Sequence, residues 1–238
     1  MADSRYVGMN AAAARLRDLD AVADNLANVE TPGFRGSRPI FQSVVAELAE
    51  GDVSQVHVTA VADGVDERSG PAIDTGSPLD VRLADGSWLA VTLEDGTVGY
   101  TRDGRLSVDA DGVVRAGSHP VHDDTGQPVV VAPGASVRIG ERGEVFANGD
   151  LTSTLGQHAI AGPLTRVRPS VVVGQDASQV SPVATPVQVG MREGSSVSGL
   201  DSAIRLIGAQ RAYDEAMQAI QTASKLDERA SELGRLRG

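Results

Sequence analysis

The chain lacks cysteine entirely, which excludes disulfides, thiolate chemistry and cysteine-based zinc or iron–sulfur sites. Its single lysine is Lys225, and no Gly-Lys-Ser run is present to cradle a phosphate, so a nucleotide-binding enzyme is not expected. No run of roughly 18 apolar residues exists that would insert into a membrane. The first residues lead into an Ala- and charge-rich stretch, so we expect export by a route other than a cleaved signal peptide.

Aromatic residues are also scarce, at 3% of the 238 residues, although 41% of the chain is hydrophobic. The core must therefore consist mainly of Val, Ala, Leu and Ile, and the 27 glycines and 11 prolines imply many turns. A formal charge of -11 repels phosphate backbones and anionic lipid. We expect no nucleic-acid partner and no direct membrane insertion.

The amino-terminal segment is predicted to form a helix over residues 4–28, because its apolar residues recur alternately every three and four positions. Pro32 and Gly33 ensure that the helix has ended. The apolar positions are Met9, Ala12, Leu16, Leu19, Ala23 and Leu26. This spacing is typical of the contact face of a coiled coil.

A second long helix is predicted over residues 198–233, with Ser198 as its cap and Asp201 beside its positive end. Its apolar positions are Leu200, Ile204 and Ile207, then Leu206, Ala209, Tyr213, Ala216 and Ile220, and then Ala223, Leu226, Ala230 and Leu233. One alternative is that each helix docks on its own domain. Narrow, Ala-rich stripes at both ends nevertheless favour helix pairing, within or between chains.

The middle of the chain carries turn dipeptides at a spacing of roughly 8–12 residues, which is typical of an all-β domain. They are Asp85-Gly86, Asp95-Gly96, Asp103-Gly104, Asp111-Gly112 and Asn148-Gly149. The predicted fold is therefore mixed α and β but segregated. Two terminal helices pair as a coiled-coil-like stalk, and a central all-β domain forms a small antiparallel sandwich or barrel.

This interpretation divides the chain into five segments. The two joints are expected to be extended connectors, and a short helix is predicted at Gln42–Glu50 within the first joint. Pro182 and Pro186 favour extended backbone in the second. The segments are 1–34 (helix and exit turn), 35–75 (connector), 76–173 (β domain), 174–195 (connector) and 196–238 (helix).

No catalytic, cofactor or metal site is predicted. His119 and His122, with the acids that follow them, are better explained as a solvated hairpin end than as a metal site. Asp109-Ala110-Asp111-Gly112 lacks the later acid of a calcium loop. Gly194–Ser198 lacks the closing glycine of a nucleophile elbow. We therefore expect a protein that is not an enzyme.

Three runs of the sequence resemble one known family. Asn25-Leu26-Ala27-Asn28-Val29-Glu30-Thr31-Pro32-Gly33-Phe34-Arg35 is similar to the signature of the flagellar hook–basal body rod family. Tyr100-Thr101-Arg102-Asp103-Gly104 resembles the start of that family's central domain. Glu193-Gly194-Ser195-Ser196-Val197 and Gln210-Arg211-Ala212-Tyr213 resemble its carboxy-terminal motif, although Ser196 stands where the family commonly has Asn.

The resemblance implies a structural subunit of the bacterial flagellar rod that polymerises through its terminal helices. Its partners would be copies of itself, other rod subunits and further basal-body components, and it would lie in the rod that crosses the periplasm after type III export. Residues 86–91 and 133–140 resemble the proximal branch of the family, with the distal branch as the alternative. From another class, a secreted β-sandwich module that binds cell-wall carbohydrate is a second alternative.

The candidate assembly residues lie in the two helices and in the turn after the first. Asn25 and Asn28 are predicted to bind backbone carbonyls, either at the helix end or in a neighbour. Thr31 and Gly33 are predicted to set the exit from the helix, with Phe34 anchored on the helix pair. The remaining candidates are Met9, Leu16, Leu19, Leu26, Leu200, Ile204, Ile207, Gln210, Arg211, Tyr213 and Ile220.

Overall fold

A computed structural model describes residues 2–46 and 55–235. The chain divides into two compact units. The first, called here the helical unit, comprises Met1–Leu26, Ser37–Asp63 and Gly199–Gly238. The second, called here the β unit, comprises Ala27–Gly36 and Gly64–Ser198. The chain therefore crosses from one unit to the other more than once, and each unit combines segments that are distant in sequence.

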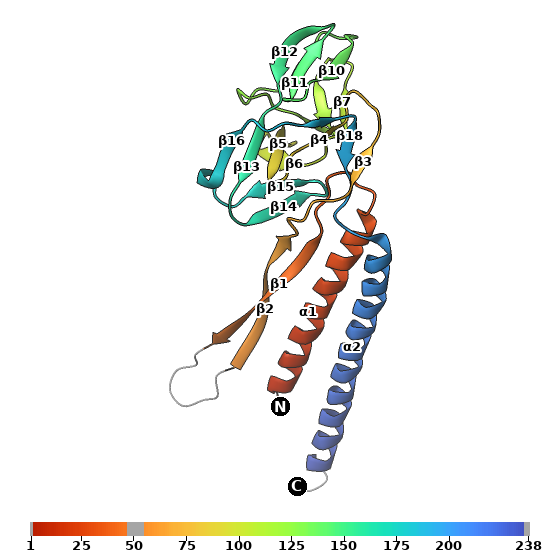
Figure 1. The fold of residues 1–238 in the computed structure, drawn as a ribbon. Helices are drawn as coiled ribbons and strands as arrows, with labels where there is room; N and C mark the ends of the chain where they lie inside the picture. Colours follow the sequence, from red (N-terminus) through yellow and green to blue (C-terminus); the bar gives the residue numbers. More distant parts are fainter. Residues whose placement is uncertain (1, 47–54, 236–238) are drawn as a thin grey trace. The chain divides into compact units, whose positions relative to one another are not determined.

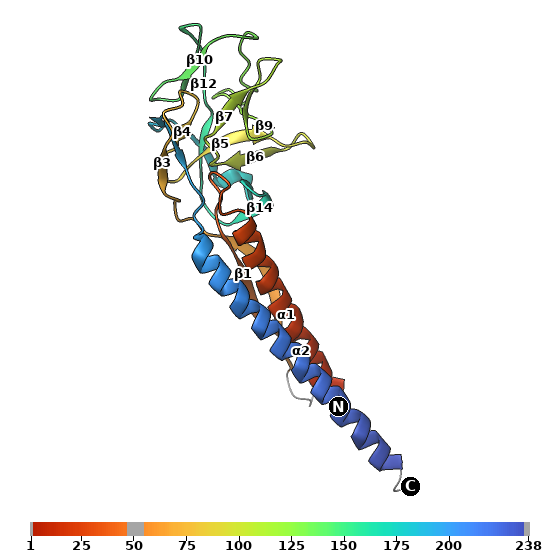
Figure 2. The same cartoon turned by 90° about the vertical axis from the view of Figure 1, so that its right-hand side faces the viewer.

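The helical unit contains the two long helices and a two-stranded sheet (Figure 1). The helices are α1 (Ala2–Ala27) and α2 (Gly199–Arg235), and the strands are β1 (Ser37–Ala46) and β2 (Gln55–Val65). Both helices lie where the sequence predicted them. Figures 1 and 2 show α1 and α2 running beside each other in opposite directions. Neither helix, over its described residues, is long and apolar enough to cross a membrane.

The short helix predicted at Gln42–Glu50 is wrong over residues 42–46, which belong to strand β1. The β-branched and aromatic residues of this segment, Ile40, Phe41, Val44 and Val45, favour a strand over a helix. Residues 47–50 lie outside the described part of the chain. The predicted first connector therefore contains two paired strands.

The β unit consists of several small antiparallel sheets, as expected for an all-β middle. The largest has the order β14-β15-β6-β5-β13-β16 and comprises β5 (Ser87–Thr92), β6 (Val98–Thr101), β13 (Gln157–Ile160), β14 (Leu164–Arg168), β15 (Val171–Gly174) and β16 (Val180–Val183). A short 3-10 helix, η1 (Ala177–Gln179), precedes β16. Pro182 is tolerated because β16 is an edge strand of this sheet.

Four smaller sheets complete the unit. They comprise β7 (Leu106–Val108), β8 (Val114–Ala116) and β9 (His119–Pro120); β10 (Val137–Ile139), β11 (Glu144–Ala147) and β12 (Asp150–Thr154); β4 (Val81–Arg82) with β17 (Gln188–Val189); and β3 (Ala72–Asp74) with β18 (Met191–Glu193). The last two pairs join residues that are more than 100 positions apart in sequence, for example Glu193 with Ala72. The segment predicted as a second connector thus pairs with the β unit.

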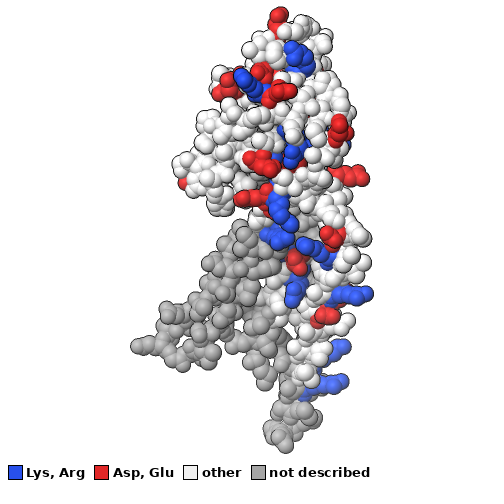
Figure 3. Space-filling model, in the orientation of Figure 1, with Lys and Arg blue, Asp and Glu red and all other residues white. Residues whose placement is uncertain are grey.

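One aliphatic core connects these sheets. Its members are buried side chains from the large sheet and from three of the smaller sheets. They include Val81, Leu89, Val91, Leu106, Val114, Val121, Ile139, Val145 and Val171. Val and Leu dominate this core, as the low aromatic content predicted. On the face that Figure 3 presents, acidic and basic side chains of the β unit are interspersed.

Four of the five predicted turn dipeptides adopt left-handed backbone, with positive φ at Gly86, Gly96, Gly112 and Gly149. In the fifth dipeptide, Gly104 stays outside the left-handed region. Gly104 is instead needed for close packing, since an added Cβ would lie 1.7 Å from the carbonyl oxygen of Val81. This glycine therefore lets two backbone segments approach closely.

Candidate functional site

The segments that lead out of α1 and into α2 are joined to each other inside the β unit. The N–H of Gly33 donates to the carbonyl oxygen of Glu193 at 3.0 Å, and the N–H of Ser196 donates to that of Phe34 at 2.9 Å. The N–H of Gly36 also donates to Ser196 Oγ at 2.9 Å. Ser196 thus has a structural role although it departs from the family pattern. The β-unit segments that lead out of α1 and into α2 are therefore fastened to each other.

Gly33 permits this arrangement through both its conformation and its size. Its φ of +64° lies in the left-handed region. An added Cβ would lie 2.3 Å from the carbonyl carbon of Arg102, so no other residue fits without backbone movement. The predicted exit turn is therefore a glycine turn pressed against the second of the three family-like motifs.

Two buried arginines share one carboxylate at this point. Arg102 Nε donates to Glu193 Oε2 at 2.7 Å and its Nη2 lies 2.6 Å from the same oxygen, while Arg35 Nη2 lies 2.9 Å from Oε1. The side chains of Arg35, Arg102 and Glu193 are 3%, 0% and 1% exposed. We call these three residues, with Trp88, the junction cluster. It brings together one residue from each of the three motifs.

The remaining hydrogen-bonding groups of the cluster are mostly satisfied by backbone. Arg102 Nη1 donates to the carbonyl oxygens of Ala84 and Ser87, and the N–H of Gly70 donates to Glu193 Oε1 at 3.0 Å. Arg35 Nη1 donates to the carbonyl oxygen of Glu67. A buried ion pair is tolerated only when its other polar atoms are hydrogen-bonded in this way.

Trp88 gives both cations a further favourable contact. The guanidinium carbons of Arg35 and Arg102 lie 5.9 and 5.7 Å from the centre of its ring. Burial lowers the pKa of Arg35, and the Glu193 carboxylate opposes that shift. Asp85 and Asp66 act in the same direction as Glu193. Arginine keeps its charge under such conditions, so the cluster is ionic.

The candidate residues at the end of α1 and in the exit turn form specific hydrogen bonds and packing contacts. Asn25 forms hydrogen bonds with both backbone groups of Ser37. Its Nδ2 donates to the carbonyl oxygen and its Oδ1 accepts from the N–H, each at 2.8 Å. These two bonds tie α1 to β1. Thr31 donates through Oγ1 to Asn28 Oδ1 at 3.1 Å. Phe34 is fully buried in the β unit, with the Arg166 guanidinium 4.3 Å from its ring centre. The β unit therefore supplies an anchor for Phe34.

The apolar stripe of α1 is divided between two environments. Ala12 is buried and Leu19 and Leu26 are half-buried, whereas Met9 and Leu16 are 61% and 42% exposed. At Gly8, near the start of α1, an added Cβ would lie 3.1 Å from Ile220 Cγ1 of α2. We call the exposed pair Met9 and Leu16 the α1 strip.

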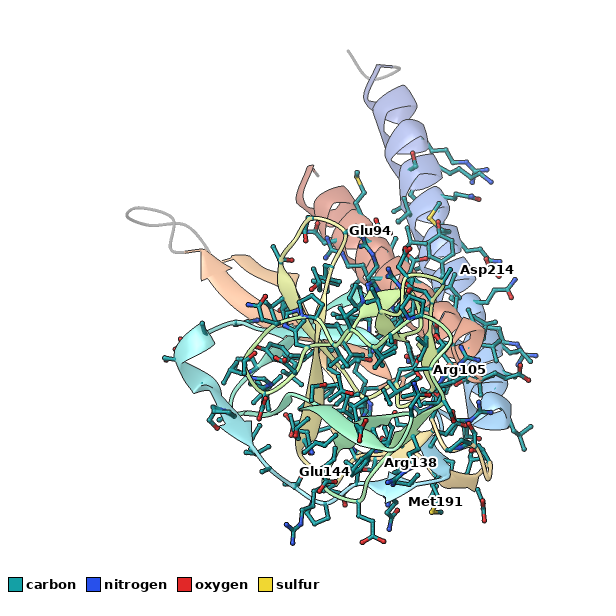
Figure 4. All side chains as sticks on the ribbon, turned by 90° about the horizontal axis from the view of Figure 1, so that it is seen from above. Glu94, Arg105, Arg138, Glu144, Met191 and Asp214 are labelled. Atoms are coloured by element: carbon teal, nitrogen blue, oxygen red, sulfur yellow. The ribbon has the colours of Figure 1, made fainter. Side chains whose placement is uncertain are left out.

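Helix α2 likewise has an inner and an outer side. Seven of its buried and half-buried positions recur alternately every four and three residues, at Ser202, Leu206, Ala209, Tyr213, Ala216, Ile220 and Ala223. We call these positions the α2 seam. Leu200, Ile204 and Ile207 are 73%, 61% and 55% exposed, and we call them the α2 strip. Gln210, Arg211 and Asp214 (Figure 4) are also exposed.

Other candidate chemistry in the β unit is structural. His122 is buried with Nε2 2.5 Å from Thr92 Oγ1, so the prediction of a solvated histidine was wrong there. Among the described residues, no group of three or more His, Asp or Glu side chains is placed to hold a metal ion. Arg138 of β10, labelled in Figure 4, lies over the ring of Phe146 on β11, with 3.9 Å between the guanidinium carbon and the ring centre.

Arg35, Arg102 and Glu193 lie within the three motifs, but no role was predicted for any of them from the sequence. Charged side chains are normally exposed, so nothing in a single sequence marks these as buried partners. The structure shows that the three runs meet.

Comparison with known families agrees with this convergence. The chain matches the flagella basal body rod protein family over residues 6–35, the D1 domain of the flagellar hook proteins FlgE/F/G over residues 85–147, and the carboxy-terminal region of flagellar basal body rod FlgEFG proteins over residues 188–233. These three regions contain Arg35, Arg102 and Glu193 in turn.

Whole proteins of similar sequence are named as flagellar basal-body rod proteins, FlgF or FlgG. The chain is 32% identical to the flagellar basal-body rod protein FlgF of Escherichia coli K12, over 96% of both chains. It is also 32% identical to the protein of that name from Mesorhizobium japonicum, over 98% of this chain and 99% of the relative. A FlgG protein of Agrobacterium fabrum is 26% identical over 90% of this chain and 92% of its own length. The chain therefore belongs to the FlgF family of flagellar basal-body rod proteins.

Proposed function

We propose that this chain is a structural subunit of the proximal rod and that it polymerises through its helical unit. Its neighbours would be copies of itself and other rod subunits. The observation that carries the proposal is the presence of large exposed apolar residues on both helices of a rod-family chain. Each such side chain gains about 1.5–3 kcal/mol when it is buried against a partner. Assembly supplies that partner.

Helix pairing within the chain would form the stalk of the subunit. The α2 seam has the spacing of a coiled-coil contact face, and its residues are small apart from Leu206, Tyr213 and Ile220. Gly8 faces Ile220 closely enough that only a small residue is accommodated easily. We infer that α1 and α2 pack as a coiled-coil-like pair through these positions.

Within the β unit, the junction cluster would hold the two segments that lead to the helices. Its two arginines and one glutamate connect the exit of the first helix with the entry of the second. The higher identity to FlgF than to FlgG proteins supports the proximal position. A rod in the basal body, reached by export without a cleaved signal, is the location that fits this role. No reaction is assigned to the chain, since its family is a structural one.

A charge on the α2 strip tests the proposal. Cells that lack their own copy of the gene would express the chain with Ile204→Asp and Ile207→Asp together. Both positions are exposed, so the purified variant should fold like the parent, as judged by circular dichroism. The cells should nevertheless fail to swim, and their basal bodies should lack the chain.

The matched control is Gln218→Asp, an exposed position on the same side of α2, three turns beyond Ile207. Cells with this variant should swim normally. Normal swimming of the cells that carry Ile204→Asp and Ile207→Asp would contradict assembly through the helical unit.

A further inference from the structure

Residues 187–196 form the last part of the β unit before the chain enters α2, and we call this segment the clasp. Strands β17 and β18 lie within it and pair with β4 and β3. Figure 1 shows β18 beside β3. The N–H of Val187 also donates to the carbonyl oxygen of Glu141, and that of Gly190 donates to the carbonyl oxygen of Asp80, each at 2.8 Å. The clasp thus contacts parts of the β unit that are far apart in sequence.

Strand pairing alone holds the clasp weakly. The pairs β3–β18 and β4–β17 are both two-stranded sheets, and neither belongs to the six-stranded sheet. A two-stranded sheet by itself is marginally stable in water. All three residues of β3 are exposed, so water reaches this pair. The clasp therefore needs further anchors.

The clasp contributes little to the aliphatic core. Val187 is the buried residue that it supplies, and Val189 packs against the core while partly exposed. The other buried members of the core come from residues 81–171. A segment with few buried apolar contacts can open while the rest of the protein stays folded. The core would therefore keep most of its members if the clasp opened.

Glu193 is the strongest anchor of the clasp, and its contacts make opening cooperative. Its carboxylate pairs with Arg35 and Arg102 and accepts the N–H of Gly70. If the carboxylate lost one of these partners but stayed buried, part of its charge would be uncompensated, which is costly. All of these contacts therefore form together or are replaced together by water.

We infer that the clasp opens and closes as one unit while the aliphatic core stays folded, and that its closure fastens the segment after α1 to the segment before α2. Two hydrogen bonds make this connection, from Gly33 to Glu193 and from Ser196 to Phe34, and both need the clasp in place. The inference goes beyond the proposed function, since it concerns the chain by itself and holds with or without assembly.

Amide hydrogen exchange of the purified full-length chain, followed by NMR, measures this opening. The N–H groups of Gly33, Gly194 and Ser196 are hydrogen-bonded within or across the clasp. They should share one level of protection, because one opening exposes all three. That protection should be lower than the protection of core amides such as those of Val114 and Val121, which need global unfolding to exchange.

Two glycine substitutions separate clasp opening from global unfolding. Gly190 and Gly96 have φ of +77° and +82°, and an added Cβ meets nothing closer than 3.7 Å at the first and nothing within 4 Å at the second. Alanine at either position is therefore strained mainly by its backbone, which shifts an opening equilibrium by about 5–30-fold. Gly190 lies in the clasp, whereas Gly96 lies between β5 and β6.

Gly190→Ala should accelerate exchange of clasp and core amides alike, because both openings release its strain. Gly96→Ala, the matched control, should accelerate exchange of the core amides alone. Opening of the clasp leaves Gly96 in its folded conformation, so the strain at that position does not favour this opening.

A disulfide that locks the clasp provides a second test. Asp74 of β3 and Met191 of β18 (Figure 4) are paired, and the N–H of the next residue, Thr75, donates to the carbonyl oxygen of Gly190. Asp74 and Met191 thus form a non-hydrogen-bonded pair, in which Cα atoms are about 4.5 Å apart and a disulfide can form. Asp74→Cys with Met191→Cys adds the two thiols to a chain that has no other cysteine.

After oxidation of this double variant, the clasp amides should exchange as slowly as the core amides, because the clasp no longer opens by itself. The reduced form of the same variant is the control and should keep the difference between clasp and core. Equal acceleration of clasp and core amides by Gly96→Ala would overturn the inference, since the clasp would then open only in global unfolding. So would unequal protection of Gly33 and Ser196 in the parent chain, or faster exchange of the clasp in the oxidised variant than in its core.

Discussion

Arg102 and Glu193 are 91 positions apart in sequence, yet Nε of the arginine donates to Oε2 of the glutamate at 2.7 Å where neither side chain is exposed to more than 1%. Glu193 also carries Arg35 on its other oxygen. One carboxylate thus serves two cations, and the loss of its charge affects all three motifs at once.

Glu193→Gln should strongly destabilise the protein. The glutamine keeps the shape of the side chain but leaves two buried guanidinium groups without a countercharge, which costs about 3–5 kcal/mol. Urea unfolding of the purified protein measures the change. Glu94→Gln is the control, because that side chain is 82% exposed and should change stability by less than about 0.5 kcal/mol. Equal midpoints for the two variants would refute an ionic cluster.

Gly33→Ala should lower the free energy of unfolding more than an alanine substitution at another left-handed glycine does. Left-handed backbone costs alanine about 1–2 kcal/mol, and the contact with Arg102 adds about 1–3 kcal/mol of crowding. Gly86→Ala is the matched control, since its φ is +80° and an added Cβ meets nothing within 4 Å. Denaturant midpoints of both variants give the difference. If the two losses are equal, the predicted crowding at Gly33 is absent.

The β unit should lose stability on mild acidification through His122 and His158. Burial lowers the pKa of both rings, so the folded chain favours their neutral forms. This contribution is complete above the unfolded pKa of about 6.5 and is lost as the pH falls through the lower folded pKa. The parent chain should therefore unfold at a lower urea concentration near pH 5 than near pH 7.5.

His122→Gln should reduce the loss of stability on acidification, although His158 still contributes part of that loss. His119→Gln, which removes a histidine outside the pair, is the control. Urea midpoints at the two pH values for all three chains test the prediction. An unchanged loss in His122→Gln would show that other groups account for the acid sensitivity.

Gly208→Ala should stabilise α2. Glycine within a helix costs about 0.5–1 kcal/mol relative to alanine, and an added Cβ at Gly208 meets nothing within 4 Å. Gly8→Ala should stabilise the protein less, because its Cβ would lie only 3.1 Å from Ile220 Cγ1. Thermal unfolding followed by far-UV circular dichroism compares the two. A larger gain at Gly8 would contradict close approach of the helices there.

The helices could be predicted from the sequence because their signals are local. The spacing of apolar residues and the stop at Pro32-Gly33 placed α1 to within two residues, and Ser198 marked the start of α2. Strand β1 was missed because Ala46–Glu50 has a helix-forming composition beside the β-forming Ile40–Val45. Composition alone did not show which tendency prevails.

The junction cluster could not be predicted because its partners are set by strand pairing across the whole β unit. Glu193 reaches Arg102 only because β18 pairs with β3. The residues next to Arg35, Arg102 and Glu193 in sequence do not indicate that these strands pair. The split of each helix between a covered side and an open strip also depends on where the partner helix lies, which periodicity alone leaves open.

The paired connections at Gly33–Glu193 and Phe34–Ser196 have a mechanical consequence. A pull on either helix reaches the sheets through a segment that is hydrogen-bonded to its counterpart and backed by the junction cluster. The two segments therefore share tension in parallel. This arrangement spreads a load over both segments instead of concentrating it on one of them.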